Sequence, residues 1–176
     1  MLFRSGDFNN YNGVARTHLI RLKPDGSFDT AFDAAAYADE IIKNVLLQKD
    51  GKIFVCGYSN DAKNVSSPYI VQLNADGSTD KSFHFSGTSG NVPWSMAFQA
   101  DGKIIVGGYT DTNGQKHPYL ARLNTDGSLD GSFQVNEATG GCIWSVAVQP
   151  DGRILAVGDI SSFDGQPCGN IVRLLN

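Results

Sequence analysis

A repeat of about fifty residues constrains the fold of this chain more than any other feature. Two interleaved series of Asp-Gly pairs run through the sequence, and within each series the steps are 51 and then 50 residues. The acidic residues of these pairs are, in chain order, Asp25, Asp50, Asp76, Asp101, Asp126 and Asp151. Such a period is typical of repeat proteins, in which one unit cannot bury its own apolar faces and therefore stacks on the next.

The two ends of the chain continue this repeat. Residues 2–22 align without gaps with residues 154–174, at an offset of 152 that equals three periods. The 176 residues therefore make three full repeats and about half of another. We expect a single domain or a fragment of one, with repeats at about 1–32 (partial), 33–83, 84–133 and 134–176 (partial).

Each Asp-Gly pair is expected to form a tight turn between two short strands. Pro24 and Pro150 directly precede the aspartate. Proline suits the second position of a type I turn and cannot take the positive φ of a type I′ turn. We therefore expect a three-residue loop in which the glycine adopts the left-handed conformation as a bulge.

This turn fixes the register of the two strands that it joins. For the loop 125–127, the count places Arg122 opposite Asp130. The same count pairs Arg21 with Asp29 and Gln72 with Asp80. Opposite charges or an amide facing a carboxylate are favourable cross-strand pairs, so the polar residues around each turn are explained by hairpin chemistry.

The rest of each repeat encodes further short strands and no helical period. Segments 94–99 and 144–149 alternate large and small residues, whereas segments 103–108 and 153–158 are apolar on both faces. Strands apolar on both faces are expected to be buried on both sides. Four short antiparallel strands per unit describe a propeller blade, so the expected fold is an all-β propeller of four-stranded blades.

Two half-motifs of the repeat resemble a known family. The pattern "LQ-x-DGKI-x-VGG", followed after a loop by "ARLN-x-DGSLD-x-SF", resembles the delta-sixty repeat of bacterial proteins. The resemblance covers nearly the whole chain and implies a β-propeller, usually within a large secreted or surface protein, with no activity assigned to the repeat. The first repeat departs most, because Arg4 replaces an apolar residue of the strand that should be buried.

Two ring architectures remain open from the strand count. One is a four-bladed ring whose end blades have three strands, and the other is an arc that another chain completes. Arg173 has no following Asp partner within the sequence. Since unpaired strand edges invite pairing, we expect a protein partner, or copies of this chain, to bind through exposed terminal strands.

Composition excludes several classes of protein. The chain is 41% hydrophobic and 18% charged, which is typical of a globular domain. Its net charge is −4 without a basic run, and no apolar run has the roughly 20 residues of a membrane span, so we expect neither nucleic-acid binding nor membrane insertion. The odd number of cysteines argues against a disulfide framework, although a bridge between Cys142 and Cys168 stays open.

Metal and cofactor signals are weak. Residues 74–80 and 124–130 hold oxygen ligands at alternate positions, as calcium loops do, but no further acidic ligand follows at the EF-hand spacing. His18, His84 and His117 lie in different parts of the repeat and have no zinc spacing. The acidic turns are therefore interpreted as structural, and no metal and no cofactor is expected.

Residues that depart from the repeat are the candidates for binding. Trp94 and Trp144 hold one blade position, where the second repeat has Lys43. Their aromatic rings suit stacking on carbohydrate or on a partner's side chains, and the alternative is packing between blades. Binding residues are also expected in the variable loops between the apolar strands, which are residues 8–18, 58–68, 109–118 and 160–170.

These observations favour a noncatalytic binding or structural propeller that serves as an interaction scaffold. The expected setting is the bacterial cell surface, the extracellular space or a virus particle, and the chain is not expected to be an enzyme. The alternative is a carbohydrate-active lyase or hydrolase that uses loop carboxylates. Candidates for such a pair, none of them singled out by the sequence, are Asp39, Glu40, Asp61, Asp111 and Glu137.

Overall fold

The computed structural model is an all-β protein. It describes residues 2–6, 8–15, 18–34, 41–60, 66–87, 90–135 and 138–175. All regular secondary structure within these ranges is β-strand. Accordingly, none of the described segments forms a helix long and apolar enough to cross a membrane.

The described strands form four antiparallel blades that follow the repeat and one separate two-stranded hairpin sheet. Blade 1 contains β1 (Leu2–Ser5) and β4 (Leu19–Leu22), with a hairpin of β2 (Asn10–Tyr11) and β3 (Val14–Ala15) between them. Blade 2 contains β5 (Ile41–Leu47), β6 (Ile53–Asn60) and β7 (Ser66–Leu73), and blade 3 contains β8 (Asn91–Phe98), β9 (Ile104–Thr112) and β10 (Gln115–Leu123). Blade 4 contains β11 (Ala138–Val148), β12 (Ile154–Phe163), β13 (Gln166–Pro167) and β14 (Ile171–Leu174).

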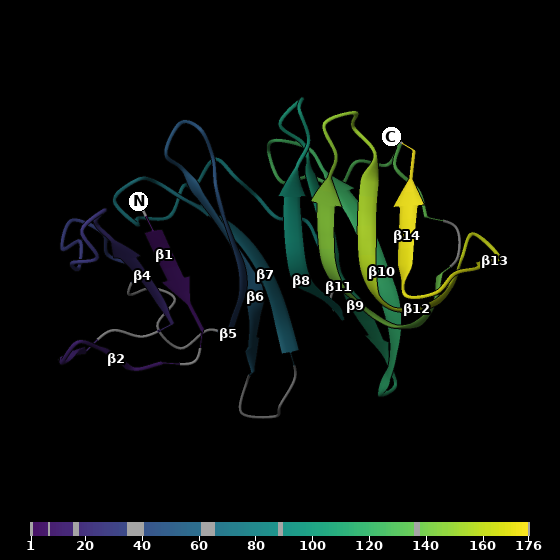
Figure 1. Ribbon diagram of the computed structural model, residues 1–176, viewed down its shortest axis with the longest axis horizontal. Coiled ribbons are helices and arrows are strands. Elements are labelled where there is room, and N and C mark those ends of the chain that lie inside the picture. Colours follow the sequence, from purple (N-terminus) through teal and green to yellow (C-terminus); the bar gives the residue numbers. More distant parts are fainter. Residues whose placement is uncertain are drawn as a thin grey trace.

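The blades are arranged as an open propeller. Figure 1 shows β1 and β4 at one end of the long axis and β14 at the other. The first strands of consecutive blades lie next to each other, β5 against β8 and β8 against β11. The structure thus confirms the expected propeller and shows its four blades as an arc.

The Asp-Gly turns have the predicted geometry. The backbone N–H of Asn124 donates to the carbonyl of Ser128 at 2.8 Å, and Gly127 has a φ of 91°. The carboxylate of Asp126 accepts hydrogen bonds from the N–H and the hydroxyl of Ser128, at 2.9 and 2.7 Å. Its oxygens therefore close the turn, and the described residues contain no group of three metal-ligating side chains.

In blades 1 to 3, the segment expected to form the outer strand of the blade pairs with the strand before it at a single bridge. In blade 3, only Leu123 and Leu129 pair across the turn. The carboxylate of Asp130 then accepts the N–H of Ser132 at 3.0 Å, and its carbonyl accepts the N–H of Phe133 at 3.1 Å. These local bonds turn the backbone away from the ladder, because an Asp side chain competes with strand pairing for backbone donors.

Apolar packing between blades forms the core. The interface of blades 2 and 3 buries residues from both sheets, namely Phe54, Cys56, Ile70, Phe83, Met96, Ile104, Val106 and Leu123. Equivalent clusters join blades 1 and 2 and blades 3 and 4. Strands that are apolar on both faces are therefore sandwiched between neighbours, as the sequence predicted.

The predicted cross-strand pairs are confirmed for the arginines and corrected for the glutamine. Arg122 Nε lies 2.8 Å from Asp130 Oδ2, and Arg21 Nε lies 2.8 Å from Asp29 Oδ2. Gln72 faces Asp80 through the backbone, but the two side chains bind elsewhere. Asp80 instead forms an ion pair with Lys52 at 2.6 Å, and the Gln72 amide donates to Gln48 at 3.2 Å. A lysine amine has the charge and reach to displace a neutral amide.

The ion pairs make stability depend on pH. Hydrogen bonds from Lys103, Ser132 and Arg122 hold the pKa of the Asp130 carboxyl well below its usual range. Since the folded pKa is the lower one, this stabilisation is present above the unfolded value of about 3.9 and is lost as the pH falls below it. We expect the melting temperature to fall progressively from about pH 5 to below pH 3, and Asp130→Asn to melt lower at pH 7 and to flatten this dependence.

Circular dichroism melts at several pH values test this prediction. Asp159→Asn, which removes an exposed carboxylate from β12, is the matched control and should leave the curve unchanged. If the melting temperatures of the native chain and of Asp130→Asn changed with pH in parallel, the assignment of this pH dependence to Asp130 would be contradicted.

The cysteines form no bridge. Cys56, Cys142 and Cys168 are all free thiols, so the bridge left open between Cys142 and Cys168 is not made. Burial raises the pKa of the Cys56 thiol and raises that of Cys142 to about 11. Buried, protonated thiols of this kind contribute to packing and are poor nucleophiles.

Candidate functional site

A β-bulge occurs at the same residue of three consecutive blades. In β8, the pairing passes from Pro93 opposite Gly108 to Ser95 opposite Gly107, which leaves Trp94 without a partner in the ladder. Lys43 in β5 and Trp144 in β11 are bypassed in the same way. A bulge redirects the side chain of its extra residue, so the side chains at these three positions are redirected in the same way.

A glycine opposite each bulge makes this geometry accessible. A Cβ at Gly108 would overlap the carbonyl oxygen of Val92. The equivalent overlaps are Gly57 with Ile41 and Gly158 with Cys142. The glycine of the "VGG" and "AVG" segments is therefore required by the close approach of the neighbouring strand, which gives the recurring glycine a structural cause.

Aromatic rings and lysines gather at the bulges of blades 2 and 3. Lys43 Nζ lies 4.7 Å from the centroid of the Trp94 ring and 5.4 Å from that of Tyr58. Trp94 packs edge-on against Tyr109, with ring centroids 6.3 Å apart, and Lys116 Nζ lies 4.5 Å from the Tyr109 ring. We call these five residues the aromatic–lysine cluster. Its cation–π contacts hold two positive charges beside ring surfaces.

Hydrogen-bonding groups complete this cluster. The indole Nε1 of Trp94 is buried and makes no hydrogen bond with the described residues, so it remains a donor. Burial raises the pKa of Tyr109, with smaller contributions from Tyr58 and Asp111, so its hydroxyl stays protonated at neutral pH. Both groups are therefore donors near the lysines.

Asp111 adds a carboxylate beside the cluster. It lies directly across the β9–β10 pair from Lys116. Its Oδ1 accepts the N–H of Gly114 at 2.9 Å, which fixes the side chain in the turn. Asp111 is exposed, and a carboxylate is a group that can accept a proton.

The structure separates the two predicted tryptophans. Trp94 is half-buried within the cluster, whereas the Trp144 side chain is 58% exposed on blade 4. Of the proposed acidic pair, only Asp111 is placed, because Asp39, Glu40, Asp61 and Glu137 lie outside the described residues. The sequence did not single out Tyr58, Tyr109 or Lys116; the two tyrosines share one repeat position, which was the available signal.

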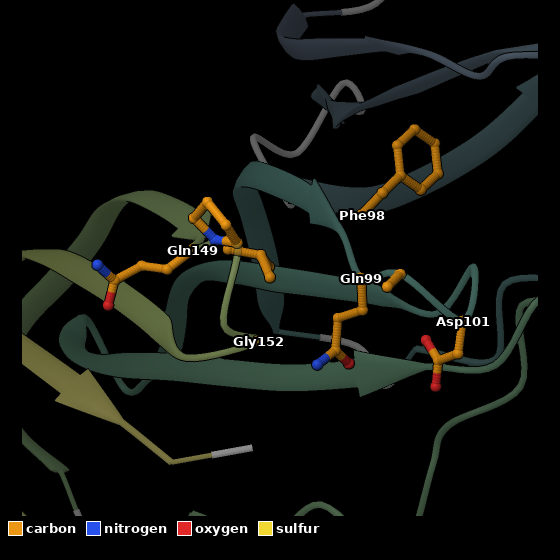
Figure 2. Close-up of a pocket in the computed structure, with 8 residues that line it drawn as sticks. Phe98, Gln99, Asp101, Gln149 and Gly152 are labelled. Atoms are coloured by element: carbon orange, nitrogen blue, oxygen red, sulfur yellow. The ribbon is translucent and has the colours of Figure 1, made fainter.

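A separate pocket lies at the other end of the inner strands. It has a volume of about 430 Å³ and lies between the turns that follow β8 and β11. Figure 2 shows Phe98, Gln99, Asp101, Gln149 and Gly152 around it. The Asp101 carboxylate accepts the N–H of Lys103 at 3.1 Å and is thus part of its turn. The lining of the pocket holds one carboxylate, which is used in its turn, and no ammonium group, so the aromatic–lysine cluster is the better candidate site.

The fold and its four-fold repetition define a repeat β-propeller. The chain belongs to the family described as a domain of unknown function (DUF5122) β-propeller, whose model matches residues 5–32, 48–83, 99–133 and 149–176. The matches cover all four blades. A comparison of the sequence with curated proteins finds no significant match.

Solved structures with a similar fold include two gluconolactonases. One, a gluconolactonase from Xanthomonas campestris, is 16% identical, with a TM-score of 0.50 over 89% of this chain and 55% of its own. The other, a structural-genomics target given a provisional gluconolactonase assignment, is 20% identical, with a TM-score of 0.47 over 85% of this chain and 54% of its own. The chain thus spans about half the length of either structure.

These neighbours correct the functional interpretation of the sequence. A noncatalytic scaffold was favoured and an enzyme was not expected, but the Xanthomonas structure that shares this fold is named a gluconolactonase. The alternative of a carbohydrate-active hydrolase agrees better with this finding. The physical reason for the error is that the repeat specifies the framework, whereas activity depends on the few residues that differ between blades.

Proposed function

We propose that the chain is a hydrolytic β-propeller whose substrate is a sugar-derived lactone, bound at the aromatic–lysine cluster. The observation that carries the proposal is the continuous series of contacts from Lys43 through Trp94 and Tyr109 to Lys116, with Asp111 opposite that last lysine. Ring faces stack on sugar rings, and ammonium groups attract the anionic oxygen that develops during ester hydrolysis.

The chemistry assigns a role to each polar group. A water oxygen bonds to the acyl carbon, the bond between that carbon and the ring oxygen breaks, the ring oxygen takes up a proton, and the new carboxylic acid releases one. In this proposal, Asp111 accepts the proton of the attacking water and returns it to the ring oxygen. Lys43, whose ammonium group lies beside the Trp94 ring, is the donor for the negative carbonyl oxygen.

The fold supports the same class of substrate. The Xanthomonas structure, named a gluconolactonase, shares the propeller architecture with this chain. We also infer that the repeats are of the delta-sixty type, because both half-motifs recur in order along the chain. The proposed substrate and the proposed repeat type are tested separately, because the substrate depends on the aromatic–lysine cluster and the repeat type depends on the strands and turns of the blades.

Proton release from glucono-1,5-lactone, measured above its spontaneous hydrolysis, tests the activity. We expect Asp111→Asn to lower kcat/KM by about 100-fold, the usual contribution of general-base catalysis. The asparagine keeps an oxygen for the Gly114 N–H, so the turn should persist.

Asp164→Asn is the matched control, because it makes the same change in the corresponding hairpin of blade 4, at a residue whose φ of 48° asparagine tolerates. This variant should hydrolyse the lactone like the native chain. Hydrolysis by the native chain no faster than the spontaneous reaction, or equal activity of both variants, would refute the proposal.

A further inference from the structure

The pocket in Figure 2 lies between equivalent turns of two neighbouring blades. One turn follows β8 in blade 3 and the other follows β11 in blade 4. Figure 2 shows Phe98, Gln99 and Asp101 on one side of the pocket and Gln149 and Gly152 on the other. Its volume of about 430 Å³ is within the range of about 300–1,000 Å³ that is usual for small-molecule sites. Because it shares no residue with the aromatic–lysine cluster, its occupant is independent of the proposed lactone.

The repeat shows how the side chains at this pocket differ from those at the preceding interface between blades. At the interface of blades 2 and 3, Phe98 packs against Phe54, with ring centroids 5.4 Å apart. At the interface of blades 3 and 4, the same two positions hold Val148 and Ile105, which belong to the apolar cluster that joins those blades. Two aromatic rings are thus replaced by smaller aliphatic side chains, and a smaller side chain leaves room beside the turns.

The rim of the pocket differs from the preceding interface by a charge. The residue directly before the aspartate of the turn is Lys49 in blade 2 and Ala100 in blade 3, where it lines the pocket. Both residues are exposed. Relative to the preceding interface, the interface of blades 3 and 4 therefore lacks two aromatic rings and one ammonium group at these positions. Since the blades share one framework, departures from the repeat are where a specific function can be placed.

Asp101 gives the pocket a negative charge. Its Oδ1 accepts the N–H of Lys103, and this backbone bond leaves the charge in place. The basic side chains that follow the two turns are paired elsewhere, Lys103 with Asp130 and Arg153 with Asp151, each at 2.7 Å. Among the described residues, none forms an ion pair with Asp101. The pocket therefore favours a ligand with a positive charge.

We propose that this pocket binds a primary amine attached by a short chain to an apolar ring, of which phenethylamine is the simplest example. The ring would occupy the space beside Val148 and Pro150, and the ammonium group would lie near Asp101 at the rim. Gln99, which is 6% exposed, adds a polar wall. The ligand would supply the ring and the charge that the chain itself has at the preceding interface. The same group occurs in a free amine and in the N-terminal phenylalanine of a peptide.

A ligand-detected NMR titration with phenethylamine, at about pH 7 where the amine is protonated, tests the charge of the site. We expect 2-phenylethanol, which has the same ring but no charge, to bind about fivefold more weakly, the upper end for an exposed ion pair. Asp101→Asn should remove this preference while keeping an oxygen for the Lys103 N–H. Asp50→Asn is the matched control and should keep the preference, because it makes the same change in the turn of blade 2, where the carboxylate accepts the N–H of Lys52 at 3.0 Å.

Two variants that fill the pocket test its location, because each introduces the residue that the repeat has at the preceding interface. Val148→Phe places a ring in the pocket, and Ala100→Lys places an ammonium group at its rim. Each should weaken the binding of phenethylamine at least about tenfold. Ala100 is exposed, so its variant should fold even if the larger phenylalanine at residue 148 disturbs the interface.

Three results would overturn the proposal. They are no binding of phenethylamine at about 10 mM, equal binding of the uncharged alcohol, and binding that Ala100→Lys leaves intact. A peptide that begins Phe-Gly-Gly distinguishes the two sources of the ligand. Equal binding of this peptide would assign the site to the N-terminus of another chain, and weaker binding would assign it to a free amine.

Discussion

Gly108→Ala is expected to lower the free energy of unfolding by about 3 kcal/mol, the upper end of the usual cost of overpacking. The new Cβ would overlap the carbonyl oxygen of Val92 on the adjacent strand. Relief requires a shift of the β8 backbone and loss of the bulge that carries Trp94. Because β8 lies between the first strands of two other blades, the shift would also disturb both of their interfaces.

Urea unfolding followed by tryptophan fluorescence measures this effect. Gly131→Ala is the matched control, because a Cβ there would meet no atom within 4 Å and its φ is not in the left-handed region. We expect the control to change stability by no more than about 0.5 kcal/mol. Equal effects at the two glycines would mean that the bulge does not require glycine.

Ile70→Ala and Ile171→Ala are expected to differ widely in cost although both change the same position of the repeat. Ile70 is 2% exposed between blades 2 and 3, so its truncation should cost about 2–5 kcal/mol. Ile171 is 55% exposed on a face of blade 4 that no other described blade covers, and its truncation should cost no more than about 0.5 kcal/mol. Both residues hold the same place in the cross-strand pairing, so a difference in cost reflects how far each side chain is covered and not the pairing of the sheet.

Thermal melts at low protein concentration provide the test. A cost for Ile171→Ala above about 2 kcal/mol in the monomer would show that the face is already covered within one molecule.

Local chemistry explains which parts of the fold were predictable. The Asp-Gly turn determines its own hydrogen bonds, so the conformation of Gly127 and the pairing of Arg122 with Asp130 followed from the sequence. The partner of Asp80 did not, because Lys52 reaches it from a different turn, the one that precedes β6. The fourth strand was overestimated because the side chain of Asp130 competes for the backbone donor of Ser132.

The candidate site depends on contacts that no local pattern contains. Trp94 was identified as a departure from the repeat, but its contact with Lys43 crosses from one blade to the next. The bulge was hidden in the sequence, because a recurring glycine has many causes and its neighbouring strand is known only in three dimensions. Trp144 was grouped with Trp94 by its position in the repeat. Trp94 is half-buried because blade 3 lies between two other blades, whereas Trp144 is 58% exposed on the last described blade.

The bulge has one more consequence, for how such a protein changes over time. Residues 43, 94 and 144 are excluded from the ladder, so exchanging a lysine for a tryptophan there costs the sheet no hydrogen bond. Mutation can therefore change the side chain at this position in one blade at a time without altering the residues that form the sheets. Duplicating a module would add a further independently variable position, which gives tandem arrays of this type an easy route to new specificities.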